Sequence, residues 1–378
     1  MLSPQEFKDL WQGLLKGLNL VRHKAIPEGA LTAHFPEHEH LWRPHLPPGK
    51  IPRPSADQWR ALELLALSVR DLFCESEAEL LLRRLRLYAQ YFREHEKQHF
   101  DGDSLRFFLG PLTPELELRS QLAELTKHLP EVDAPPLMTA QQAIQVFHSQ
   151  LGLAALDREV KVLSVPHSLS KAATGKDYIR LSDEHHYSER DVAQLFAHEA
   201  LVHLRSNLAG AAQRDLFWLS SWSPAITAFQ EGLALVSELA TGAMDAARWR
   251  RLQLRHDFAL CALKGRSARD CFAQSQREGL SAAEAMELVL RIYRGSSLEG
   301  GMCFPKELLY LKGLELWLSR RGLLTPGDVS IALVGKMDFL EWDLLRSKSF
   351  LPRLNLRPLG ARDPLVQYLV GAEVSKSA

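Results

Sequence analysis

The stretch DVAQLFAHEALVH, residues 191–203, places His198, Glu199 and His203 in one largely apolar run. A second carboxylate, Glu231, follows in the equally apolar run FQEGLALV, residues 229–236. Imidazoles and carboxylates on buried helices need partners, and a metal ion supplies them. Two His ligands, one Glu ligand and one Glu base are the groups that a zinc hydrolase uses. The two runs therefore predict two helices that carry a zinc site.

The spacing of the two histidines sets a structural condition on this site. His198 and His203 are five residues apart, whereas the common zinc helix has its histidines four residues apart. Five residues of an ideal α-helix separate two side chains by roughly 140°, too far for them to share one ion. We therefore expect a π-bulge between Ala200 and Val202, a widening of the helix that tends to occur at functional sites.

Local signals support both helices. Ser188 precedes Asp191 by three residues, which is typical of a capping box at a helix start. Glu238 follows Glu231 by two helical turns and lies on the same face, so it is a candidate partner for a ligand histidine; a surface ion pair is the alternative. Gly232 is expected to let its helix lie close to the metal helix, the predicted helix that carries His198 and His203.

Three ordered blocks of the chain resemble a known family. They are the histidine block, the run QEGLA (residues 230–234), and the paired segments RIYRGS (291–296) and GGMCFPKELLYLKG (300–313). Together they are similar to a bacterial family of QEGLA-motif, flavohaemoglobin expression-modulating proteins, which is related to the microtubule-associated tyrosine carboxypeptidases. The matching blocks cover about residues 160–315. Leu201 and Val202 stand where the family usually has small residues, which leaves substrate preference open.

The residues and the resemblance together assign roles at the zinc site. His198, His203 and Glu231 are expected to bind one Zn²⁺ per chain and to leave a fourth position for water. Glu199 is expected to take the proton of that water and pass it to the leaving amine.

An exopeptidase also needs groups that recognise its substrate. A cation binds the terminal carboxylate, and a hydrogen-bond donor stabilises the tetrahedral oxyanion. The third block offers Lys306 and Arg294 for the carboxylate and Tyr310 for the oxyanion, and Arg205 is a further carboxylate candidate. Ordinary surface charges and a tyrosine that anchors its helix are the alternative interpretation.

The resemblance implies a zinc-dependent metallocarboxypeptidase that releases an aromatic residue such as Tyr from the C-terminus of a peptide or protein. Two alternatives stay open. One is a zinc aminopeptidase or endopeptidase, and the other is a non-catalytic regulatory protein with a structural metal site. Glu199 argues against the last of these, because a structural site has no use for a base.

Composition narrows the class of protein. The chain has 378 residues with 46 basic and 46 acidic side chains, so no basic surface for nucleic acid is implied. Its four cysteines show no C-x-x-C spacing, which favours a reducing compartment. The first 20 residues resemble an amphipathic helix rather than a signal peptide, and no apolar run is long enough for a membrane span. These features predict a soluble cytoplasmic protein with no membrane or nucleic-acid partner.

The pattern along the chain predicts a predominantly helical α+β fold that resembles zinc metallopeptidases, with a small β-sheet beside the metal-binding helix. We divide the chain into residues 1–56, a helix followed by an extended Pro- and His-rich arm; 57–152, a helical region; and 153–378, the catalytic domain. Strands are expected at 160–165 and 178–182. His95 and His99 are expected to lie at an exposed helix end.

Helices are expected at 113–128, 189–208, 224–242, 245–263, 267–277, 281–294, 304–321 and 325–340. The arm leaves open a second metal site, at His34, His38, His40 and His45.

Overall fold

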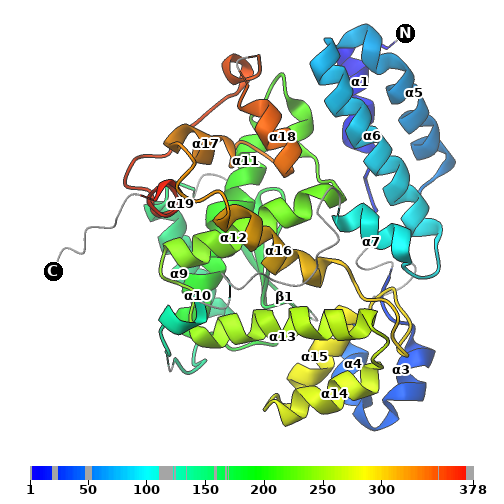
Figure 1. Ribbon diagram of the computed structural model, residues 1–378, viewed down its shortest axis with the longest axis vertical. Helices are drawn as coiled ribbons and strands as arrows, with labels where there is room; N and C mark the ends of the chain where they lie inside the picture. Colours follow the sequence, from blue (N-terminus) through cyan, green and yellow to red (C-terminus); the bar gives the residue numbers. More distant parts are fainter. Residues whose placement is uncertain are drawn as a thin grey trace. The chain divides into compact units, whose positions relative to one another are not determined.

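A computed structural model shows a mostly helical protein, with 62% of residues in helices and one three-stranded sheet (Figure 1). This confirms the expected α+β class. The structure describes residues 2–18, 24–46, 53–109, 122, 125–132, 134–156, 160–166, 168, 170–347 and 349–371. The chain forms two compact units that alternate along the sequence. The first comprises Met1–Thr113, Ser223–Ala225 and Arg255–Leu308, and the second Pro114–Trp222, Ile226–Leu254 and Leu309–Ala378.

The described residues of the first unit form helices joined by turns and loops, with no strand among them. Apolar side chains such as Phe7, Trp11 and Tyr88 are almost completely buried in it. Its helices are α1 (Pro4–Gly13), α3 (Glu28–His34), α4 (Glu39–Trp42), α5 (Ala56–Leu72), α6 (Glu75–Glu96), α7 (Gly102–Leu109), α14 (Ala268–Arg277) and α15 (Ala282–Ile292), and α13 (Ala246–Leu263) and α16 (Lys306–Leu318) contribute to both units.

Two expectations for the first unit were wrong. The Pro- and His-rich segment is not extended between residues 28 and 45, because α3 and α4 alternate there with 3₁₀ turns. Pro36 and Pro44 occupy the first turns of such helical segments, where a missing N–H costs nothing and a fixed φ is favourable. Pro47, Pro48 and Pro52 lie outside the described residues. His95 is fully buried rather than exposed, because its side of α6 faces the core, whereas His99 is exposed as expected.

The second unit contains the sheet. Strand β1 (Lys161–Val165) pairs in parallel with β3 (Tyr178–Ser182), and β2 (Ala172–Thr174) pairs antiparallel on the other side of β3. The sheet packs on the predicted metal helix, since Ile179 and Leu181 share one hydrophobic cluster with Ala200 and Leu204. The expectation of a small sheet beside that helix is therefore confirmed.

The remaining regular elements of the second unit are helices. The predicted helix 189–208 is continuous but changes type along its length, as described below. The predicted helix 325–340 is instead two helices, because Asp338 caps a new one through the backbone N–H of Glu341. The expected helix 113–128 lies largely outside the described residues. The helices are α9 (Ala140–Leu153), α10 (Glu189–Leu195), α11 (Arg205–Ala211), α12 (Thr227–Ala240), α17 (Pro326–Ile331), α18 (Phe339–Leu345) and α19 (Pro364–Val370).

Helix α12, which carries Glu231, crosses α16 at a pair of glycines. A Cβ atom on Gly232 would lie 2.2 Å from the carbonyl carbon of Gly313, and one on Gly313 would lie 2.0 Å from the Ala228 oxygen. The Trp317 indole also donates a 3.0 Å hydrogen bond to the Phe229 carbonyl. Gly232 thus allows α12 to approach α16 closely. The expectation was that it would allow a close approach to the metal helix, and the structure corrects this.

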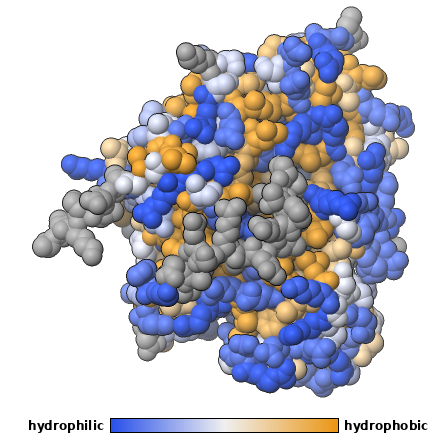
Figure 2. All heavy atoms as spheres, viewed as in Figure 1, coloured by the Kyte–Doolittle hydropathy of each residue, from blue (hydrophilic) through white to orange (hydrophobic). Residues whose placement is uncertain are grey.

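No helix in the described part of the chain is both long and apolar enough to cross a bilayer. On the face drawn in Figure 2, hydrophilic and hydrophobic side chains are interspersed.

Candidate metal centre

The helix that carries both histidines is a π-helix from Phe196 to Leu204, between α10 and α11. The capping box of Ser188 and Asp191 begins α10 as predicted. A π-helix bonds residues i and i+5, so side chains five apart lie on one face. The imidazoles of His198 and His203 accordingly lie with ring centroids 4.9 Å apart. The widening that the histidine spacing required is confirmed.

Glu231 on α12 faces both imidazoles. Its Oε2 atom lies 3.3 Å from Nε2 of His198 and 3.7 Å from Nε2 of His203. The ligand atoms of the three residues all lie within 4.8 Å of one another. The side chains are 8%, 17% and 9% exposed for His198, His203 and Glu231, so the cluster is largely shielded from solvent while His203 retains some access.

The residues present fit a zinc ion. Two ligand atoms about 2.1 Å from a tetrahedral ion are about 3.4 Å apart, close to the two nitrogen-to-oxygen distances observed. Within the described ranges, this is the one group of three or more potential ligand residues so arranged. The histidines of the 34–45 segment do not form a second such group.

Glu238 fixes the orientation of His198. The His198 Nδ1 atom donates a 2.8 Å hydrogen bond to Oε1 of Glu238, whose side chain is fully buried. The contact of Nδ1 with Glu238 reserves Nε2, which faces Glu231, as the atom that can bind a metal once its own proton is displaced. The seven-residue spacing from Glu231 to Glu238 thus predicted a real partner of a candidate ligand.

The charges around His198 alter its proton affinity. Burial alone would lower the pKa of His198, but its hydrogen bonds with Glu231 and Glu238 raise the pKa to about 9. Burial would raise the pKa of Glu238, but the Arg248 guanidinium and His198 outweigh it and hold the pKa at about 2. Glu238 is therefore a carboxylate at neutral pH, and a proton competes with a metal ion for His198.

Glu199, the candidate base, lies on the π-helix next to His198 and is partly exposed. Its Oε2 atom accepts a 2.6 Å hydrogen bond from Oγ1 of Thr174 at the end of β2. Asn207 on α11 donates from its side chain to the carbonyl of Gly175, which ties the end of β2 to the same helical segment. The sequence did not point to Thr174, because three residues of strand are too short to show an alternating pattern.

The candidate substrate-binding residues have different surroundings. The Tyr310 ring lies 6.5 Å from the His198 imidazole, centroid to centroid, at an interplanar angle of 28°. Arg205 pairs with Asp363 at 3.4 Å, so its charge is already partly balanced. Lys306 and Arg294 belong to the first unit, where Arg294 lies over the Phe304 ring. Tyr310 therefore packs beside a candidate ligand within the second unit.

Comparison with known proteins adds one finding. A family model described as microtubule-associated tyrosine carboxypeptidase matches residues 81–349. The match covers most of the chain and includes the histidine pair, Glu231 and the third sequence block. No curated protein matches the chain.

Proposed function

Because the chain belongs to the microtubule-associated tyrosine carboxypeptidase family, we propose that it is a zinc-dependent carboxypeptidase. It would remove an aromatic C-terminal residue such as tyrosine from a peptide or protein. The observation that carries the proposal is the convergence of His198, His203 and Glu231, because the π-helix brings together two histidines that an α-helix would separate.

Each residue of the site has a separate proposed role in hydrolysis. Zinc bound by His198, His203 and Glu231 would lower the pKa of a water molecule to about 7. Glu199 would take a proton from the attacking water as the water oxygen adds to the scissile carbonyl carbon, and would deliver that proton to the amine when the carbon–nitrogen bond breaks. Tyr310 donates a hydrogen bond to the oxygen that becomes negative during the addition.

Recognition of a free C-terminus requires a cation. Arg205, which belongs to the same unit as the metal cluster, is proposed for the terminal carboxylate, with Lys306 and Arg294 as the further candidates that the sequence resemblance implies. A carboxypeptidase built this way leaves a peptide with an amidated C-terminus intact, because the amide has no charge for the cation to bind.

The test combines metal analysis with peptide mass spectrometry. We expect about one zinc per chain and the loss of one residue from peptides that end in Tyr or Phe. Matched peptides that end in Lys, and amidated copies of the Tyr and Phe peptides, are expected to be cleaved poorly or not at all. Cleavage of the amidated peptides would instead identify an aminopeptidase or endopeptidase. A Glu199→Gln variant that cleaves as fast as the wild type would exclude the proposed mechanism.

A further inference from the structure

Arg248 on α13 makes a forked contact with Glu238, the carboxylate that accepts a hydrogen bond from His198. We propose that Arg248 is a positioning residue of the metal centre, which sets zinc affinity by holding Glu238 against His198. This inference rests on the zinc site of the proposed function. It concerns metal binding and can be tested without any peptidase assay.

The first step is the fork itself. Nε of Arg248 donates to Oε2 of Glu238 at 3.1 Å, and Nη2 donates to Oε1 at 3.0 Å. Glu238 is fully buried and Arg248 is 17% exposed. Two parallel charge-assisted hydrogen bonds fix the plane of a carboxylate in a way that one contact cannot. The Glu238 oxygen that accepts from His198 is therefore held in a set direction.

The second step is the anchoring of Arg248. Asp245 precedes α13, and its Oδ1 atom accepts a 2.6 Å hydrogen bond from the backbone N–H of Arg248. Such a cap satisfies a backbone donor at the helix start and places the first turn of the helix. The position from which Arg248 reaches Glu238 is thus set by Asp245.

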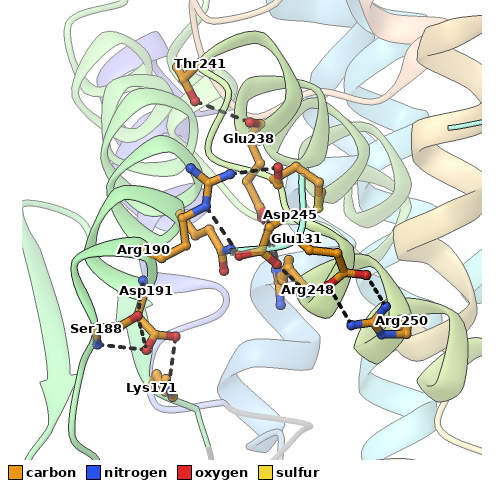
Figure 3. A network of polar contacts seen from close by, with 12 residues as sticks. Glu131, Lys171, Ser188, Arg190, Asp191, Glu238, Thr241, Asp245, Arg248 and Arg250 are labelled. Atoms are coloured by element: carbon orange, nitrogen blue, oxygen red, sulfur yellow. Dashed lines mark hydrogen bonds and ion pairs between the residues drawn. The ribbon is translucent and has the colours of Figure 1, made fainter. Parts of the chain in front are cut away.

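The third step returns to the metal helix. Oδ2 of Asp245 accepts from Nε of Arg190 at 3.3 Å and from Nε2 of Gln194 at 3.0 Å, and Arg190 also donates to the Met244 carbonyl at 2.9 Å. Arg190 and Gln194 lie on α10, which leads directly into the π-helix that carries His198. Figure 3 shows Arg190 on α10, Glu238 on α12, and Asp245 and Arg248 at the start of α13 turned toward one another.

These contacts form a closed ring around the ligand histidine. It passes from His198 to Glu238, Arg248 and Asp245, and back to the metal helix through Arg190. Each of its two carboxylates pairs with a guanidinium, so neither Glu238 nor Asp245 is buried without a charge partner. Removing Arg248 opens the ring next to Glu238, whose side chain can then rotate away and leave the imidazole without a fixed orientation. Substitution of a residue that hydrogen-bonds to a ligand histidine typically weakens metal binding by about 10- to 100-fold.

The experiment compares Arg248→Met, Arg248→Lys and Arg250→Met in the full chain. Arg250 is the matched control, because it lies on the same helix and makes the same kind of fork, but with the exposed Glu131. Zinc dissociation constants are measured by competition with a chromophoric chelator, and the melting temperature of each metal-free variant is measured in parallel. We expect Arg248→Met to weaken zinc binding about tenfold or more, Arg248→Lys to fall between it and the wild type, and Arg250→Met to stay within about twofold of the wild type.

A double variant separates positioning from general destabilisation. If Arg248 acts through Glu238, then Arg248→Met changes zinc affinity little once Glu238→Gln is present, and Arg248→Met alters the absorption spectrum of bound Co²⁺. Additive losses with an unchanged cobalt spectrum would overturn the inference. So would a wild-type zinc affinity in Arg248→Met, which would leave the zinc site and the proposed function standing. A wild-type chain that binds no zinc would overturn both this inference and the proposed function.

Discussion

Thr174 donates a 2.6 Å hydrogen bond from Oγ1 to Oε2 of Glu199, and so joins the end of β2 to the candidate base. A hydrogen bond to a charged group contributes about 1.5–3 kcal/mol. We expect Thr174→Val to lower kcat/KM about tenfold on a Tyr-ended peptide, since 1.4 kcal/mol corresponds to a factor of ten. Zinc content should not change, because the Thr174 hydroxyl bonds to Glu199, which is not one of the three candidate ligands. Thr174→Ser retains the hydroxyl and is expected to recover most of the rate; a Ser variant as slow as the Val variant would argue against this role.

The candidate base and the candidate ligands are separable by substitution. Glu199→Gln removes a carboxylate that lies outside the three converging ligand atoms, so zinc should stay bound while kcat falls about 10²- to 10⁴-fold. His203→Ala and Glu231→Gln should lose both zinc and activity. Metal analysis of each purified variant beside its rate is the measurement. Loss of zinc from Glu199→Gln would mean that this residue also supports the metal.

The sequence predicted those features of the site that depend on the spacing of residues along a single helix. Two histidines five residues apart can share an ion only on a widened helix, so their spacing predicted the π-helix of Phe196–Leu204. Glu238 was predictable because seven residues return to the same helix face as Glu231. In both cases the partners lie on one element or one face, where helix geometry alone relates them.

Other features of the structure could not be predicted from the sequence around the residues concerned. Arg248 lies in the first turn of a third helix and Asp245 directly precedes that helix, and nothing in the sequence around them indicates that they meet Glu238 and Arg190. Residues 28–45 are helical although rich in proline, because a proline in a first helical turn begins a helix as readily as an internal one ends it. Gly232 gave a correct signal of close approach but not the partner, which is Gly313 rather than the metal helix.

Zinc affinity should depend on pH through His198. Its pKa of about 9 lies above the 6.5 of an unperturbed histidine. The metal-free protein therefore gains stability from the protonated imidazole below pH 6.5 and loses it as pH rises through about 9. Because zinc must displace this proton, the logarithm of the zinc association constant should rise about one unit per pH unit up to about pH 9 from this group. Chelator competition across pH 6.5 to 9.5 measures the slope, and an affinity independent of pH over this range would contradict the assignment.

The crossing of α12 and α16 should govern stability and metal binding together. Gly232→Ala places a Cβ atom 2.2 Å from the backbone of Gly313, where no flexible side chain can move aside. Overpacking typically costs about 1–3 kcal/mol, and any shift of α12 moves Glu231 relative to both imidazoles. We expect a lower melting temperature of the metal-free protein and weaker zinc binding. Gly152→Ala is the matched control, since Gly152 is also helical but has nothing within 4 Å of its Cβ position, so alanine there should be neutral or stabilising. If Gly232→Ala behaves like Gly152→Ala in both measurements, the two helices do not approach as closely as the glycine pair requires.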